Sequence, residues 1–287
     1  MARPPQHLTP EAEDRILVFI PAYNCGPQIG RVLAKLDRMP AGLFEEVLLV
    51  DNQSSDGTPL LALEAAKEIH TIPITVVRNR ENYGLGGSHK SAFAYATQKG
   101  YTHVIVLHGD DQGNIADVLP VLATGMHRRF DCCLGSRFAR ASRLKGYSAI
   151  RMMGNYVFNT LFSLVSRRLV TDLGSGLNIL SRRVFSDPAL LHYSDDLRFN
   201  CYLLLGLVAS GRSFRYFPIT WVEEDQISNV KIFSQSLNTL KILAQYLFSR
   251  RAFQTMDHRT VAHQSYVFDV VGSNQPAPER VLEAVAR

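Results

Sequence analysis

The sequence is poor in cysteine and has no cysteine pattern that would organise a metal site or a disulfide framework. Four cysteines stand in a chain of 287 residues: Cys25, Cys132, Cys133 and Cys201. The adjacent Cys132 and Cys133 lack the CxxC spacing that structural zinc sites use. We therefore expect reduced thiols in a cytoplasmic protein.

Long apolar runs are missing too. The N-terminal stretch has no apolar segment of signal-peptide type, so secretion is not expected, and residues 1–14 are predicted to be a disordered leader. A transmembrane helix needs roughly 18 or more uninterrupted apolar residues. The run from Val157 to Val165 is soon broken by Arg167 and Arg168. Any membrane contact should therefore be peripheral, on the cytoplasmic face.

What the chain does have is enough apolar material for a large core and a mild excess of positive charge. Hydrophobic residues make up 46% of the sequence, and the net charge is +5, with a sequence pI near 9.1. That charge suits partners that carry phosphate, such as a nucleotide or a lipid head group. Nucleic acid is not expected as a partner, because no recognition motif accompanies the charge.

Short apolar runs alternate with segments of helical periodicity. The predicted strands are Ile16–Ile20, Val47–Val50, Ile74–Val77, His103–Leu107 and Asp131–Gly135. The predicted helices are Gln28–Leu36, Pro59–Ile69, His89–Lys99, Asn155–Leu169, Asn200–Ala209 and Leu237–Phe248. This alternation predicts an α/β domain over residues 15–250, with a mostly parallel sheet covered by helices on both faces, followed by a C-terminal tail over 251–287.

Polar loops follow the first two predicted strands, and in parallel sheets such loops meet at one edge. Tyr23 and Asn24 offer an aromatic face for a nucleobase and a polar group beside it. Asp51 stands at the tip of the second strand, where its carboxylate can accept hydrogen bonds from a base or a ribose hydroxyl. The alternative for the following Ser55-Asp56-Gly57 is a turn and a helix cap.

The sequence His108-Gly109-Asp110-Asp111-Gln112 ends the fourth buried strand. Oxygen ligands at a strand end suit Mg²⁺ or Mn²⁺, which often neutralise a leaving diphosphate. The alternative is a solvated turn that only terminates the strand.

Six motifs, in this order, resemble glycosyltransferase family 2, and in particular its dolichol-phosphate mannosyltransferase and polyprenyl-phosphate sugar transferase branch. They are PAYN at Pro21, VDNQSSDGT at Val50, NYGLGG at Asn82, LHGDDQ at Leu107, GSRF at Gly135 and TDLGSGLNILSRRVF at Thr171. The resemblance covers Arg15 to Phe248. It implies a Rossmann-like GT-A fold and an inverting, divalent-metal-dependent transfer of a sugar from a UDP- or GDP-sugar, of hexosyltransferase type.

The resemblance also implies roles for single residues. Those that would bind the nucleotide sugar are Pro21, Tyr23, Asn24, Asp51, Gly109, Asp110, Arg137 and Lys231, and those that would bind the metal are His108, Asp110 and Gln112. His108 replaces the first acid of the D-x-D-x-Q pattern of the family. It either ligates Mn²⁺ as a neutral imidazole or only packs beside the site. In the loop before the last helix an acidic stretch replaces the arginine of the family.

The acceptor is less defined. Asn200 falls near the position where relatives that glycosylate hydroxyl groups carry a catalytic acid, which favours a lipid-phosphate acceptor that needs no base. Asp195 and Asp196 lie close enough to serve as a base, or they cap a helix. The rival functions are transfer to a hydroxyl group, and nucleotide-sugar binding or nucleotidyl transfer without glycosyl transfer.

Two helical regions could meet a membrane. The stretch from Arg137 to Arg168 interleaves arginine with aromatic residues and methionine, as a basic amphipathic surface does, and the last predicted helix carries Leu240, Leu247 and Phe248. For both, the alternative is a core helix with solvated charges.

Overall fold

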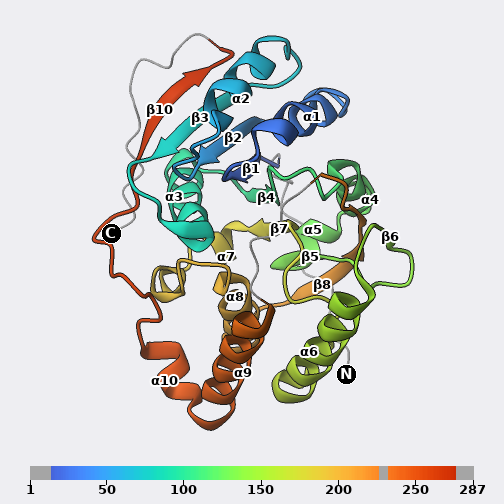
Figure 1. Ribbon diagram of the computed structural model, residues 1–287, viewed down its shortest axis with the longest axis vertical. Helices are drawn as coiled ribbons and strands as arrows, with labels where there is room; N and C mark the ends of the chain where they lie inside the picture. Colours follow the sequence, from blue (N-terminus) through green and yellow to red (C-terminus); the bar gives the residue numbers. More distant parts are fainter. Residues whose placement is uncertain (1–13, 226–231, 276–287) are drawn as a thin grey trace, which may run out of the picture.

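The computed structural model describes residues 14–225 and 232–275. Its centre is an eight-stranded sheet with the order β10-β3-β2-β1-β4-β7-β5-β8 (Figure 1). The strands are β1 (Ile16–Ala22), β2 (Glu46–Asp51), β3 (Ile74–Asn79), β4 (His103–Leu107), β5 (Cys132–Ser136), β7 (Leu177–Ser181), β8 (Phe214–Pro218) and β10 (Phe268–Ser273). A small parallel pair, β6 (Arg143–Lys145) with β9 (Thr220–Val222), stands apart from it.

Most neighbours in the large sheet are parallel. β1 pairs in parallel with β2 and with β4, β2 with β3, and β5 with β8, whereas β7 and β10 run antiparallel to their neighbours. The parallel connections need crossovers, which the intervening helices supply. The predicted α/β fold with a mostly parallel sheet is confirmed.

Helices cover both faces of the sheet. They are α1 (Gly26–Asp37), α2 (Thr58–Lys67), α3 (Gly84–Lys99), α4 (Leu119–Ala123), α5 (Met126–Arg129), α6 (Ala149–Ser166), α7 (Arg182–Phe185), α8 (Phe199–Ala209), α9 (Ile232–Phe248) and α10 (Arg250–Thr255), with 3₁₀ turns η1 (Ile115–Val118) and η2 (Pro188–His192). Successive side chains of a strand point to opposite faces. Val18 and Ile20 therefore pack in the core beneath α1 and α2, whereas Leu17 and Phe19 pack with α3, α8 and α9.

Five strands were not predicted: β6, β7, β8, β9 and β10. Of these, β7 lies within the segment TDLGSGLNILSRRVF and separates β4 from β5, and β8 forms the edge of the large sheet beside β5. β10 comes from the region predicted as a tail and forms the other edge of the sheet, beside β3. Part of residues 251–287 is therefore integrated into the sheet. Of the predicted leader, Asp14 alone lies within the described residues.

The start of α3 also differs from the prediction, because the glycines of NYGLGG form its first turn. Gly84 has φ of +72°, and a Cβ on it would lie 2.5 Å from the carbonyl oxygen of Asp195. A Cβ on Gly86 would lie 2.3 Å from the carbonyl oxygen of Ser194. Without side chains, these residues let the N–H groups of Gly86 and Gly87 donate to the Asp195 carbonyl, at 2.6 and 3.2 Å.

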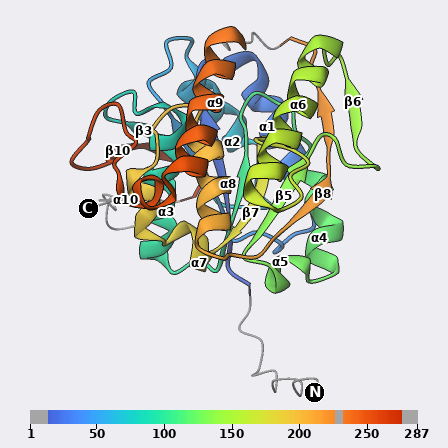
Figure 2. The ribbon, with the colours of Figure 1, turned by 90° about the horizontal axis from the view of Figure 1, so that it is seen from below.

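α6 and α9 lie next to each other on the outside of the molecule, as Figure 2 shows. Within the described part of the chain, no helix is both long enough and apolar enough to cross a membrane. All four cysteines are buried and unpaired.

Candidate active site

The loops that follow β1, β2 and β4 meet at the carboxyl ends of these strands, as the parallel pairing requires. The N–H of Gly109 donates to the carbonyl of Pro21 at 3.1 Å, and the N–H of Asn52 donates to the carbonyl of Ala22 at 2.9 Å. A Cβ on Gly109 would lie 3.0 Å from the sulfur of Cys25. The absence of a side chain at Gly109 thus allows the loop after β4 to close on the loop after β1.

The first two loops hold each other through side-chain hydrogen bonds. The Asn24 amide oxygen accepts from the N–H of Ser55 at 2.9 Å, and the N–H of Asn24 donates to the Ser54 hydroxyl at 2.9 Å. The Asp56 carboxylate accepts from the N–H groups of Gly26 and Thr58, at 2.9 and 3.0 Å, where α1 and α2 begin. The backbone N–H and the side-chain oxygen of Asn24 are therefore both used in hydrogen bonds between the two loops.

The side chains of Tyr23 and Asp51 differ in their exposure to solvent. The Tyr23 side chain is half exposed at the rim, where an aromatic ring can stack on a base. Asp51 is fully buried: its carboxylate accepts from the N–H of Ser54 at 3.2 Å and lies 3.4 Å from Nε of Arg78. The nucleotide-binding roles of both residues stay predictions.

The two adjacent acids of the loop after β4 point in different directions. Asp111 has φ of +62°, and its carboxylate binds Lys35 Nζ at 2.6 Å and Arg31 Nε at 2.9 Å, both on α1. Asp110 stays with the loop, where its Oδ1 accepts from the N–H of Gln112 at 3.2 Å. The carboxylate of Asp111 thus forms ion pairs with α1.

The electrostatics around Asp110 suit a cation. Burial, together with the negative charges of Asp111 and Glu223, raises the pKa of Asp110 to about 6. The ionised carboxylate therefore costs free energy here, and a bound divalent cation would offset that cost. Carboxylate and amide oxygens are donors that Mg²⁺ and Mn²⁺ accept, so the chemistry of Asp110 and Gln112 fits such an ion, and their roles as metal ligands stay predictions.

His108 is neutral at physiological pH. Burial, and to a smaller extent the charge of Arg137, lowers the pKa of His108 to about 4. A Cβ on Gly176 would lie 2.6 Å from the His108 ring, so the ring packs closely against the Gly176 backbone. The imidazole is in the form that ligates a metal and is also well packed, which leaves both predicted roles open.

Glu223, at the end of β9, is a site residue that the motif analysis did not single out. The N–H of Val222 donates to the carbonyl of Gln112 at 3.0 Å, which joins β9 to the loop after β4. The Glu223 carboxylate accepts from Arg151 at 2.7 Å and from the Trp221 indole at 3.3 Å. An acid therefore lies beside Asp110 in the segment where the family has an arginine.

Arg137 is buried and paired. Its guanidinium donates twice to Asp172, at 2.8 and 2.7 Å, and its backbone N–H donates to the same carboxylate at 2.9 Å. Trp221 and Tyr147 present ring faces to the guanidinium at 5.1 and 5.6 Å. Asp172, which lies in the motif at Thr171 but was given no role from the sequence, thus balances the charge of Arg137, and the phosphate contact of Arg137 stays a prediction.

Asp195 forms a buried ion pair. Its Oδ1 accepts from Lys90 Nζ at 2.6 Å and from the Tyr266 hydroxyl at 2.8 Å. The Lys90 side chain has no exposed surface, and burial lowers its pKa to about 8 although Asp195 opposes that shift. This contact connects α3 to the segment that leads into β10.

Asp196 is a surface acid. Burial alone would raise the pKa of Asp196, but hydrogen bonds from Arg198 and Ser194 lower it. Its Oδ1 accepts from the N–H of Arg198 at 2.8 Å, just before α8. The lowered pKa and the ion pair with Arg198 make Asp196 a poor base, and its catalytic role, like that of Asp195, stays a prediction. Lys231 lies outside the described residues.

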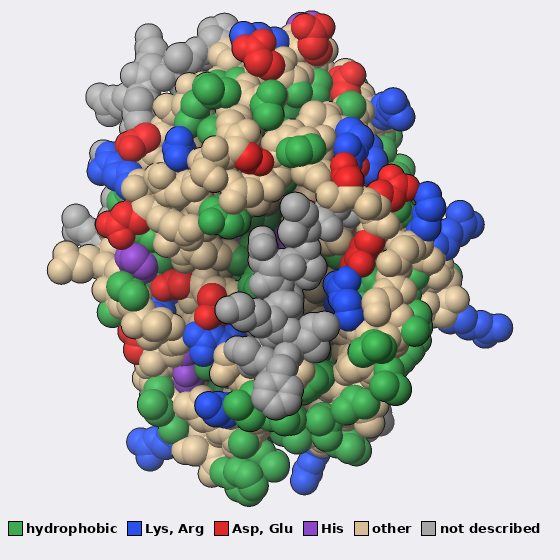
Figure 3. Space-filling model, in the orientation of Figure 1, with side chains coloured by type: hydrophobic (Ala, Val, Ile, Leu, Met, Phe, Trp, Pro, Cys, Tyr) green, Lys and Arg blue, Asp and Glu red, His purple; other side chains and the backbone are tan. Residues whose placement is uncertain are grey.

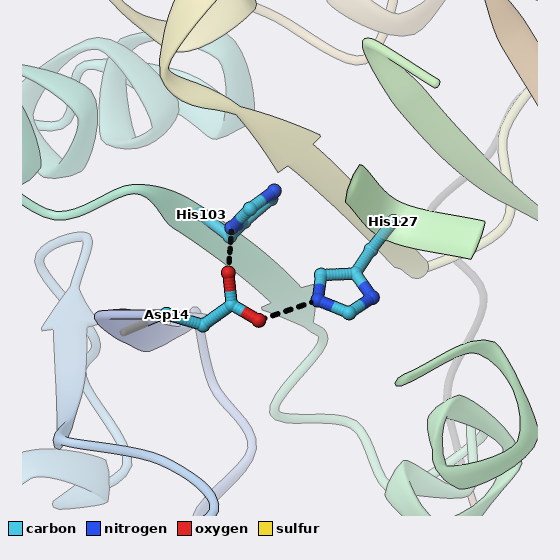
Figure 4. Close-up of side chains that lie close together, drawn as sticks. All are labelled: Asp14, His103 and His127. Atoms are coloured by element: carbon cyan, nitrogen blue, oxygen red, sulfur yellow. Dashed lines mark hydrogen bonds and ion pairs between the residues drawn. The ribbon is translucent and has the colours of Figure 1, made fainter. Parts of the chain in front are cut away.

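A second polar cluster lies at the opposite edge of the sheet, near the amino ends of β1 and β4 (Figure 4). In the described residues it is the single His, Cys, Asp and Glu group of three whose ligand atoms all lie within 4.8 Å. Asp14 accepts from His127 Nε2 at 2.8 Å and lies 3.6 Å from His103 Nδ1. Nε of Arg128 donates to the same Asp14 oxygen as His127 at 2.8 Å, so a protein cation already balances this carboxylate. The cluster anchors the chain before β1.

Comparisons with known proteins agree with this geometry. Residues 17–187 match the family model described as Glycosyl transferase family 2. The dolichol-phosphate mannosyltransferase of Pyrococcus furiosus is 25% identical over 140 residues, which cover 48% of this chain and 38% of that protein. The undecaprenyl-phosphate mannosyltransferase of Micrococcus luteus is 28% identical over 163 residues, covering 56% and 64%. The alignments thus leave part of each relative unmatched.

Solved structures share the fold. The glucosyl-3-phosphoglycerate synthase of Mycobacterium tuberculosis, in complex with Mn²⁺, UDP-glucose and phosphoglyceric acid, superimposes with a TM-score of 0.58. The match covers 81% of this chain and 79% of that chain, at 16% sequence identity. At 16% sequence identity, the similarity shows that the two chains share a fold.

Asp195→Asn should destabilise the protein by about 3 kcal/mol, because it leaves the buried Lys90 ammonium without its partner. Asp196→Asn is the matched control: it loses a half-exposed ion pair but keeps a side-chain oxygen that can accept from the N–H of Arg198, and should cost less than about 1 kcal/mol. Urea unfolding followed by circular dichroism measures both. Equal stabilities of the two variants would contradict the structural role of Asp195.

Proposed function

This chain belongs to glycosyltransferase family 2, and from that premise we propose which sugar transfer it carries out. The donor is a UDP- or GDP-sugar, the reaction depends on Mg²⁺ or Mn²⁺, and the acceptor is a polyprenyl- or dolichyl-phosphate-like lipid. The observation that carries the proposal is the meeting of the loops after β1, β2 and β4 around Asp110, with the neutral His108 and Gln112 beside it.

The donor half of the proposal is supported by both geometry and relatives. Tyr23 at the rim would stack on the base, and Asp51 at the end of β2 would bind the nucleoside. Asp110 and Gln112, with or without His108, would hold the divalent ion, which when bound neutralises the charge of the leaving diphosphate. The Mycobacterium tuberculosis structure contains Mn²⁺ and UDP-glucose on the same fold.

The proposed acceptor is supported by the surroundings of Asp195 and Asp196, the two carboxylates considered as a base. A hydroxyl acceptor needs a base within hydrogen-bond reach, whereas a phosphate monoester is already anionic. Asp195 is held by Lys90 and Tyr266, and Asp196 pairs with Arg198 just before α8. Asn200, which cannot take a proton, is close to Gly174, whose carbonyl accepts from Arg137. This arrangement favours the phosphate acceptor.

In the proposed reaction an oxygen of the lipid phosphate attacks the anomeric carbon of the sugar from the side opposite the nucleotide. The bond from that carbon to the diphosphate breaks, the nucleoside diphosphate leaves with the electron pair, and the configuration inverts. No proton has to be removed from the acceptor. The Arg137 and Asp172 pair would keep the loops after β5 and before β7 together during this step.

A thermal-shift screen of UDP-, GDP- and dTDP-sugars tests the donor. With Mn²⁺ present, one donor class at about one hundred times its dissociation constant should raise the melting temperature by about 5–10 °C, because it binds only the folded state. The same donor without metal should give a smaller rise. If no nucleotide sugar stabilises the protein with saturating Mn²⁺, the proposed donor is wrong.

Asp110→Asn should separate stability from metal binding. In EDTA the variant should melt higher than the parent, by about 2–4 °C for each kcal/mol gained, because a buried negative charge is removed. The additional stabilisation by Mn²⁺ with donor should disappear. Asp111→Asn is the control, since it breaks the ion pairs to Lys35 and Arg31 and should not raise the melting temperature. Full metal-dependent stabilisation of Asp110→Asn would remove this residue from the site.

An acceptor assay separates the rival functions. With a radiolabelled donor, short-chain polyprenyl phosphate should become labelled, whereas simple sugars should not. Asp196→Asn should keep this activity because no base is needed. Labelling of a hydroxyl acceptor that is lost in Asp196→Asn would support the hydroxyl alternative, and donor binding with no transfer at all would support a binding protein.

A further inference from the structure

We propose that α6 and α9 together form a docking surface for an anionic lipid bilayer. The proposal deepens the lipid-phosphate acceptor suggested above, but the evidence for it is independent of the active site. It consists of the exposed apolar side chains of the two helices, the distribution of charge around them, and a groove that opens beside α6.

α6 exposes an unusual amount of apolar surface. Only Asn159, Phe162 and Ser166 are buried among its 18 residues. Large exposed side chains recur at helical spacing along one face, at Ile150, Met153, Val157 and Leu164, and Leu164 is 70% exposed. A surface helix of a monomer normally turns such a stripe toward the core. Here a different face of α6, with Phe162, contacts the core.

α9 repeats the arrangement. Its Ile242, Leu243 and Tyr246 are buried in the core. Its outer face carries Leu237, Leu240, Leu247 and Phe248, of which Phe248 is 84% exposed. The two helices contact each other. In Figure 3, hydrophobic side chains gather over the lower part of the molecule, where Figure 1 places α6 and α9.

The chain segments that carry this surface contain no acidic residue. No aspartate or glutamate occurs from Cys132 to Thr171, or from Gln226 to Met256, although the chain has 26 acidic residues. Five exposed basic side chains flank the two helices or lie on them: Arg167, Arg168, Lys241, Arg250 and Arg251. An apolar centre with a basic border complements a bilayer that contains anionic lipid. Two copies of such a surface would repel each other, which disfavours a homodimer.

A groove of about 560 Å³ runs along the C-terminal half of α6. Phe138, Tyr156, Leu164 and Leu169 are among its lining residues, together with Arg167 and Arg168. Phe138 directly follows Arg137 of the candidate site. The groove therefore leads from the apolar surface toward the site, and it offers a place for the hydrocarbon chain of a lipid, with Arg167 and Arg168 in its lining.

The test is co-sedimentation of the full chain with vesicles, without donor or metal. Phosphatidylcholine vesicles that contain phosphatidylglycerol should bind the protein. Pure phosphatidylcholine vesicles should bind it at least about tenfold more weakly, because they lack the negative charge that attracts each basic residue near the membrane surface. High salt should weaken the binding. Absence of binding to the anionic vesicles would overturn the proposal.

Variants locate the surface. The double variant Met153→Glu with Phe248→Glu should lose at least about tenfold in vesicle affinity, because it puts charges on the apolar stripes but leaves the groove lining unchanged. Leu60→Glu is the matched control: Leu60 is 64% exposed on α2, on the other face of the sheet. All the substituted side chains are exposed, so melting temperatures should stay unchanged. Equal binding by the double variant and the control would overturn the assignment.

Two further measurements keep this proposal separate from the proposed function. The double variant should retain thermal stabilisation by the donor and activity on a water-soluble, short-chain prenyl phosphate, since neither requires a bilayer. Loss of vesicle binding alone therefore concerns the surface, and loss of donor binding in the parent concerns the function. Light scattering, which measures the oligomeric state, tests whether a second copy of the chain covers this surface. If the parent is a dimer and the double variant is a monomer, the surface binds a second copy and the bilayer proposal is wrong.

Discussion

The position of β1 between β2 and β4 is the constraint on which the rest of the site depends. The three strands are parallel and their interiors are almost fully buried, so their carboxyl ends lie at one edge of the sheet. Gly109 then approaches Pro21 and Cys25 closely enough for a main-chain hydrogen bond. Tyr23 and Asp110 lie on the loops of this junction, and Asp51 is the last residue of β2. Glu223 follows β9, which is hydrogen-bonded to the loop after β4.

Around that junction the structure treats buried charges in two ways. Lys90 with Asp195, and Arg137 with Asp172, form close pairs that connect distant segments, so these ions stabilise the architecture. Burial and the nearby charges of Asp111 and Glu223 raise the pKa of Asp110. Such a carboxylate is expensive for the fold alone and becomes favourable when a cation binds. The contrast distinguishes the groups that hold the domain together from those that suit a ligand.

Much of this could be predicted from the sequence. Buried parallel strands leave continuous apolar runs, and His103–Leu107 was located at its observed bounds. The family was recognisable because its motifs follow one another in order. Five strands were missed, three of them in the large sheet. β7 lies in a glycine- and serine-rich motif, and the edge strands β8 and β10 each have exposed residues in their interior, so none of the three shows the apolar pattern of a central strand. The start of α3 was missed because glycine is a poor helix former.

By itself, then, the sequence determined the fold class, the family and the loops that carry polar groups, because these depend on local periodicity and motif order. Only the tertiary structure decided which of two adjacent acids turns toward α1, that Asp195 is held by Lys90 and Tyr266, and that Asp172 balances Arg137. It also brought α6 and α9 together with their apolar faces outward. These outcomes depend on contacts between residues far apart in the chain, and no local pattern encodes which partner a charged or apolar side chain will meet.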